Sequence, residues 1–142
     1  MKKVLIGAVF ITLVMLPAFG SQNRPHDADF KPFYADFLKA VKANDKEKIA
    51  DLIAFPVKDW SIDQNHNVTT GSIKDRADFL ARYNVLFTAS MRTRIPRAKL
   101  EPLKYDSAYM ISWREQDIEC SFEFEYIDGA GYRVRSFSIG PS

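Results

Sequence analysis

The sequence has 142 residues, with 20 Lys+Arg against 18 Asp+Glu and a formal net charge of +2. That length suits one domain, and a hydrophobic fraction of 46% is too high for a disordered chain. A single cysteine excludes a disulfide scaffold and any thiolate metal cluster.

The first twenty residues have the pattern of a secretory signal peptide. Two lysines follow the initial methionine, an apolar run extends from Val4 to Leu16, and small residues precede Ser21. The run is shorter than the about 20 residues that span a bilayer, so it does not predict a membrane anchor. We expect removal of residues 1–20 by cleavage between Gly20 and Ser21, and a bacterial protein that is periplasmic or secreted, with no stable membrane anchor afterwards.

Cleavage would change the charge of the chain. Lys2 and Lys3 lie in this segment and no acid does, so the rest of the chain balances its basic and acidic residues at 18 each. A neutral chain has no overall field that attracts nucleic acid or an anionic membrane. We therefore expect no nucleic-acid partner.

A polar lead-in precedes the first predicted helix. Residues 21–28 predict a flexible segment, which leaves a single domain over residues 29–142. Apolar side chains then recur at helical spacing and predict a helix over about residues 30–43, capped by Asp29 and with Pro32 in its first turn. The apolar stripe consists of Phe30, Phe33, Tyr34, Phe37, Leu38 and Val41.

A second, shorter helix and a hairpin are predicted next. Asp45 is placed to cap the helix, and Phe55–Pro56 ends it because a residue before proline disfavours the α region. Residues 57–62 predict a strand, residues 63–67 a polar turn and residues 68–70 a short return strand.

The third predicted helix starts at about Asp75, with Ser72 or Asp75 as its cap. From Thr88 the helical period is lost, and residues 92–105 predict an irregular strand that carries a basic edge.

Three clear strands close the chain. Residues 108–114 and 118–127 alternate between apolar and polar side chains, and residues 128–131 predict a glycine-rich hairpin turn before a last strand over residues 132–139. The apolar spacing in that strand predicts a β-bulge near Arg135–Ser136. The inward-facing residues of the middle strand are Ile118, Cys120, Phe122, Phe124 and Tyr126.

This order of elements predicts an α+β fold, with the N-terminal helices packed on a curved antiparallel sheet. Three stretches, Phe37–Asp45, Ile49–Pro56 and Asp128–Phe137, resemble small exported bacterial members of the nuclear transport factor 2-like superfamily. The resemblance spans about residues 30–140 and implies a cone-shaped fold shared with ketosteroid isomerase and scytalone dehydratase. It also implies a deep, mainly apolar pocket between helices and sheet, and a homodimer through the outer sheet face.

The resemblance leaves the catalytic roles of the steroid isomerases largely unfilled. The position of their helix-one tyrosine falls on Phe37, which has no hydroxyl, and that of their oxyanion aspartate falls near Phe122 or Glu123. The position of their base falls near Asp59 or Ser61. At most one of the three roles is therefore filled.

The histidines and the cysteine predict neither a metal site nor a cofactor. His26 lies in the lead-in and His66 lies in a turn beside Asp63, where a solvated side chain is the favoured interpretation; their separation gives no zinc pattern. Cys120 is expected to be a buried, unreactive thiol, because no basic group shares its face.

A dense basic patch falls in the irregular strand. Arginine forks could dock a carboxylate, but a charged strand edge that prevents aggregation is the favoured interpretation. Glu119, Glu123 and Glu125 could pair with the patch across strands or between subunits. The patch consists of Arg92, Arg94, Arg97 and Lys99.

The candidate ligand-binding residues are aromatic. Four of them bring polar tips to apolar faces, as the mouth of a pocket requires, although simple core filling explains them equally well. With two inward aromatics of the middle strand, the predicted site consists of Tyr34, Trp60, Tyr83, Trp113, Phe122 and Phe124.

Two functions remain open. The favoured one is an exported, non-catalytic binding or protein-interaction module that takes a small apolar or amphipathic molecule in its pocket, or a protein partner on its sheet. The alternative is a small cofactor-free enzyme for isomerase- or dehydratase-type proton transfer, with Asp59 or Asp63 as base and Tyr34 or Tyr83 as hydrogen-bond donor.

We predict that the exported protein starts at Ser21, because the lysines, the apolar run and the small residues before it match the signal-peptidase pattern. Intact-mass measurement of the periplasmic or secreted fraction checks this. A mass that still includes Met1–Gly20 would contradict it.

Overall fold

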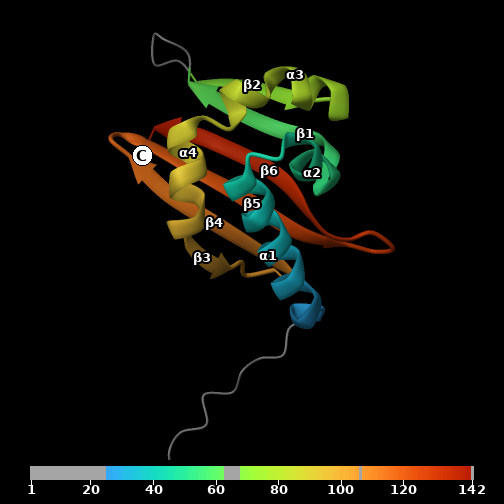
Figure 1. The fold of residues 1–142 in the computed structure, drawn as a ribbon. Helices are drawn as coiled ribbons and strands as arrows, with labels where there is room; N and C mark the ends of the chain where they lie inside the picture. The colour runs from blue at the N-terminus through green and yellow to red at the C-terminus, as the bar shows by residue number, and fades with distance from the viewer. Residues whose placement is uncertain (1–24, 63–67, 106, 142) are drawn as a thin grey trace, which may run out of the picture.

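The fold has two layers, with helices covering one face of a single curved sheet (Figure 1). The structure, a computed structural model, describes residues 25–62, 68–105 and 107–141; for residues 58–62, 68–70 and 140–141 it describes the backbone alone. The elements are α1 (Asp27–Ala43), α2 (Lys46–Asp51), β1 (Ile53–Ile62), β2 (Val68–Ile73), α3 (Arg76–Leu86), α4 (Ala89–Arg94), the 3₁₀ turn η1 (Ile95–Arg97), β3 (Lys99–Pro102), β4 (Ala108–Glu115), β5 (Ile118–Ile127) and β6 (Gly131–Pro141).

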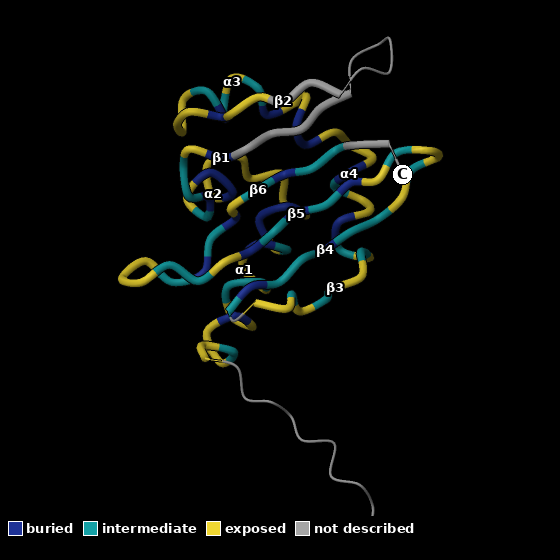
Figure 2. Tube along the Cα trace, turned by 180° about the vertical axis from the view of Figure 1, so that it is seen from behind, coloured by how far each residue is buried: buried dark blue, intermediate teal, exposed yellow. Residues whose placement is uncertain are grey.

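The sheet has the strand order β2-β1-β6-β5-β4-β3. Its neighbours are antiparallel except for β1 and β6, which run parallel. Helices α1 and α4 lie side by side across the sheet, while α2 and α3 lie at its β1–β2 end (Figure 1). The view from behind shows many half-buried positions along β4 and β5, because the helices of the described residues lie on the other face of the sheet (Figure 2).

The predicted β-bulge in the last strand is present. Glu123 pairs with Ser136 and Phe124 pairs with Val134, so Arg135 is the extra residue of β6. An extra residue reverses the alternation of side chains along the strand. The bulge thereby keeps three side chains buried that are not evenly spaced in the sequence: Tyr132, Val134 and Phe137.

Helix α1 begins at Asp27, earlier than the predicted start near residue 30. His26 precedes it in the left-handed conformation, and its ring stacks on Tyr126 with centroids 3.6 Å apart. Asp27 and Ala28 thus belong to the helix, and Pro32 lies in its second turn.

The second helix ends sooner than predicted. Asp45 caps α2 by accepting a hydrogen bond from the Lys48 amide at 3.0 Å, as expected, but the helix stops at Asp51. Strand β1 starts at Ile53 and runs through Phe55–Pro56, so proline lies within a strand. Pairing with β6 explains the difference, because a sheet partner outweighs local helical preference.

The return strand β2 is longer than predicted and reaches Ile73, while the predicted turn over residues 63–67 lies outside the described residues. Helix α3 follows the prediction. Asp75 caps it by accepting from the Asp78 amide at 2.9 Å, and the Asp78 carboxylate accepts from the Lys74 amide at 2.9 Å.

The prediction of an irregular strand over residues 92–105 is wrong for the first half of that range, which is helical. Thr88 caps α4 by accepting from the Met91 amide at 3.2 Å, and η1 continues the helical turns to Arg97. The arginines had suggested alternation, but the buried pair Met91 and Ile95 has the four-residue spacing of a helix. Only β3 remains as a strand, at the edge of the sheet.

Phenylalanines fill the space between the helices and the sheet. The Phe122 ring lies 6.1 Å from Phe37 of α1, 5.4 Å from Phe87 and 4.8 Å from Phe137, measured between centroids. Phe124 is fully buried and meets Phe37 edge-on at 5.2 Å. In the described part of the chain, no helix is long and apolar enough to cross a membrane.

We predict that Phe122→Ala lowers the free energy of unfolding by about 3–5 kcal/mol, because it opens a cavity beside three rings. Val85→Ala is the control, because Val85 is 77% exposed and its truncation should change stability by less than about 0.5 kcal/mol. Denaturant titration measures both. Similar small losses for the two variants would place Phe122 outside the core.

Candidate functional site

The structure does not bring the predicted ligand-binding residues together at one pocket. Tyr83, Phe122 and Phe124 are 3%, 1% and 0% exposed and belong to the core. Tyr34 and Trp113 line two separate pockets at the margins of the helical layer. The side chain of Trp60 lies outside the described part of the structure.

An apolar pocket lies between the N-terminal half of α1 and strands β3 and β4. Its volume is about 370 Å³, within the range of small-molecule sites. We call it the apolar pocket, and it is lined by Asp27, Phe30, Lys31, Tyr34, Ala35, Leu38, Leu100 and Tyr109.

Aromatic stacking builds the wall of the apolar pocket. Phe30 is buried and stacks on Tyr109 with centroids 3.7 Å apart, and the Tyr109 hydroxyl donates to the Asp27 carboxylate. Burial raises the pKa of Tyr34, so its hydroxyl stays protonated at neutral pH and can donate a hydrogen bond. Leu100 of the edge strand leaves 38% of its surface exposed and completes the apolar lining.

A second cleft lies between the C-terminal end of α1 and the α4–η1 turns. Its volume is about 670 Å³. Among the described residues its lining includes three cations and no carboxylate, so it is strongly basic. We call it the cationic cleft, and it is lined by Val41, Lys42, Ala89, Arg92, Thr93, Pro96 and Arg97.

Arg92 is held in place by neutral partners. Its guanidinium donates to the Phe87 carbonyl, and the adjacent Tyr83 hydroxyl donates to the Asn44 side-chain oxygen at 2.9 Å. Burial raises the pKa of Tyr83, and the nearby Arg92 charge opposes that rise. The guanidinium of Arg92 is therefore partly buried and fixed without a carboxylate that neutralises it in the described region.

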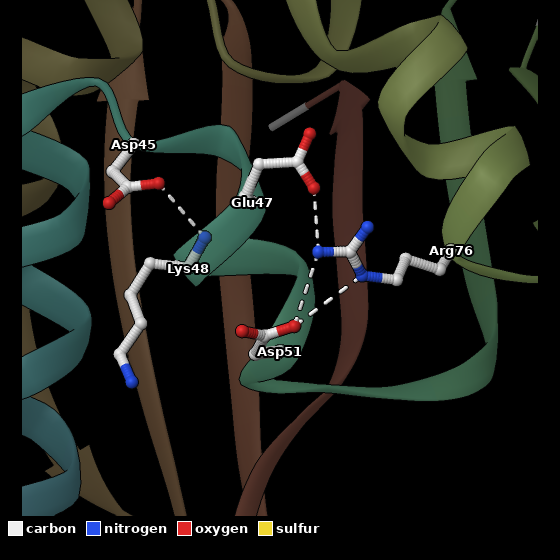
Figure 3. Close-up of polar contacts among 5 residues, drawn as sticks. All are labelled: Asp45, Glu47, Lys48, Asp51 and Arg76. Atoms are coloured by element: carbon white, nitrogen blue, oxygen red, sulfur yellow. Dashed lines mark hydrogen bonds and ion pairs between the residues drawn. The ribbon is translucent and has the colours of Figure 1, made fainter.

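Other arginines of the protein do pair with acids. Arg76 of α3 reaches Glu47 at 2.6 Å and Asp51 at 3.3 Å, beside the capped start of α2 (Figure 3). The hydrogen bond that the Arg76 guanidinium donates to Glu47 raises the pKa of Arg76. Arg135 reaches Glu125 on the uncovered sheet face at 3.3 Å. These surface pairs join neighbouring elements, each with a modest effect on stability.

The predicted basic patch is divided by the structure. Arg94 lies 3.6 Å from Glu115 and borders a pocket of about 500 Å³ next to Trp113, while Lys99 starts β3 and pairs with Glu101. Arg97 lines both this pocket and the cationic cleft. The patch is mostly helical, so protection of a strand edge applies to Lys99 alone.

One of the two histidines lies in the described part of the structure. His26 lies 3.5 Å from Asp29 at the start of α1, while His66 lies outside the described residues. No group of three potential metal ligands occurs within the described parts of the chain.

No protein-family model matches the sequence, and no curated protein matches it. A nuclear transport factor 2-like protein of unknown function from Silicibacter pomeroyi is 12% identical, with a TM-score of 0.47 over 82% of this chain and 96% of that chain. One from Shewanella baltica is 13% identical, with a TM-score of 0.46 over 81% and 94%. A cystatin-like protein of unknown function from Methylobium petroleophilum is 13% identical, with a TM-score of 0.45 over 81% and 76%.

The solved structures to which this chain is similar include nuclear transport factor 2-like proteins, the superfamily that its sequence resembles. The α+β class predicted from the sequence is confirmed by the helices and the mostly antiparallel six-stranded sheet of the structure.

The structure describes some of the residues that the resemblance matched to the catalytic positions of the steroid isomerases. Phe37 is fully buried, and Glu123 lies on the uncovered sheet face, where it accepts from the hydroxyls of Tyr105 at 3.1 Å and Ser136 at 3.3 Å. Asp63 lies outside the described residues, and of Asp59 only the backbone is described.

Cys120 should be unreactive in the folded protein. The residue is 5% exposed, and burial, with a further contribution from Glu115, raises its pKa to about 11. We predict that a thiol reagent at pH 8 labels the native protein at least about a hundredfold more slowly than the denatured chain, since the thiolate is the nucleophile. Equal rates in the two states would contradict the burial of this strand face.

Proposed function

We propose that this protein is an exported, non-catalytic binding module that takes a small apolar or amphipathic molecule in the apolar pocket beside α1. The observation that supports it is an apolar lining that remains accessible although the core is filled. Leu100 and the half-buried Tyr34 and Leu38 face a volume of about 370 Å³. Such a lining favours a ligand with an alkyl or flat apolar body.

The polar groups of the pocket favour binding over proton transfer. A general base must reach the substrate while a donor holds the developing oxyanion. Asp27 is the one carboxylate in the described lining, and it already accepts a hydrogen bond from Tyr109. That bond ties the start of α1 to β4, so these two groups serve the architecture of the pocket. The Tyr34 hydroxyl is left to orient the polar end of a ligand.

Binding of a neutral amphiphile tests the proposal. We predict saturable binding of 1-decanol below its solubility limit, and at least about a tenfold loss of affinity in Leu100→Asp, because the new carboxylate must lose water beside the alkyl chain. Val85→Asp is the matched control, since Val85 is an exposed apolar residue of α3 outside the pocket. Titration by calorimetry or fluorescence measures the affinities. Absence of saturable binding, or equal losses in both variants, would contradict the proposal.

A further inference from the structure

We infer that the apolar pocket and the cationic cleft form one groove along α1, which binds an amphipathic anion: an alkyl chain that ends in a carboxylate or phosphate. This inference rests on the proposed function, because the alkyl chain would occupy the apolar pocket. It adds the charge of the ligand and the direction in which the ligand lies.

Both sites lie on the same flank of α1. Leu38 lines the apolar pocket and Val41 lines the cationic cleft one helical turn later. From Tyr34 to Lys42 the helix rises by about 12 Å at 1.5 Å per residue, which is within the reach of a medium-length alkyl chain. Helix α4 and η1 both contact α1 and lead along the chain into β3, so the elements that line the cationic cleft are followed directly by the strand that carries Leu100 of the apolar pocket (Figure 1).

Charge defines the direction of the ligand. Lys42, Arg92 and Arg97 lie at one end of the groove, with no carboxylate in the described lining there. At the other end the lining carries one carboxylate, Asp27, and one cation, Lys31, whose charges offset each other. An anionic head is therefore drawn to the α4 end, with its tail toward Leu100.

The cations are suited to an anion in different ways. Arg92 is already oriented by the Phe87 carbonyl, so little side-chain freedom is lost when it donates to an anion. Lys42 and Arg97 are exposed and have no acidic partner among the described residues, so both can turn toward the head group. The carbonyl groups at the end of α1 do not repel the anionic head group, because they already accept hydrogen bonds. The Ala40 carbonyl accepts from the Asp45 amide at 3.0 Å, and the Val41 carbonyl accepts from the Asn44 amide at 3.1 Å.

The test compares ligands that share a ten-carbon chain but differ in head group. Decanoate, decyl phosphate and 1-decanol are titrated below their micelle or solubility limits into the wild-type chain, with acetate and inorganic phosphate as head-group controls. We expect decanoate or decyl phosphate to bind at least about tenfold more tightly than decanol, and the stronger of the two identifies the head group. The preference should decline at high salt, because salt screens exposed charges.

Charge-matched double variants locate the head group. Lys42→Gln/Arg97→Gln should abolish the preference for the anion and leave decanol binding unchanged. Lys39→Gln/Arg114→Gln removes the same charge from exposed positions that do not line the cleft and should keep the preference. Circular dichroism confirms that both variants fold.

The outcomes separate the two claims. Equal affinities for anion and alcohol, or a preference that survives Lys42→Gln/Arg97→Gln, would overturn this inference and leave the proposed function standing. Failure of every ten-carbon ligand to bind would overturn both. Tight binding of inorganic phosphate or acetate alone, with no gain from the chain, would overturn the single groove.

Discussion

The packing of phenylalanines against Phe122 constrains everything that this fold can bind. Rings from α1, from the end of α3 and from β6 fill the space between the helices and the sheet, where the resemblance implied a deep pocket. A ligand in that space would have to displace fully buried rings, at a cost that a small apolar molecule cannot offset. Binding therefore moves to the margins of the helical layer, where α1 leaves one flank uncovered beside the edge of the sheet.

Helix α1 consequently has two roles. Its buried stripe, which includes Phe30 and Phe37, fixes the helix on the sheet, while the flank that carries Tyr34, Leu38 and Lys42 borders the groove. The contact of Tyr109 with Asp27 and the cap of Asn44 on the last carbonyls hold both ends of the helix. A rigid helix keeps the apolar and cationic parts of the groove at a constant separation, which is the condition for selecting a ligand by length.

Much of the fold could be predicted from the sequence because its signals are local. The alternation around Phe122, the cap at Asp75 and the uneven apolar spacing that requires a bulge at Arg135 are each visible within a few residues. The start of β1 at Ile53 could not be predicted in this way, because it depends on pairing with β6, which lies far along the chain. The arginines of α4 were assigned to a strand for a different, local reason: polar residues on exposed helical turns can imitate alternation.

The site could be predicted only in part. Tyr34 was identified from the apolar stripe, but the sequence could not show that Leu100 and Tyr109 would meet it, nor that Arg92 would be fixed by a backbone carbonyl. The central claim is a ligand that lies along α1. Isotope-filtered NOEs between decanoate and the labelled protein test it most directly. The account predicts NOEs from the terminal methyl to Leu38 and Leu100, and from the methylene next to the carboxylate to Thr93 and Pro96. NOEs to the core residues Phe122 and Phe137, or to the exposed Pro56 of β1, would contradict it.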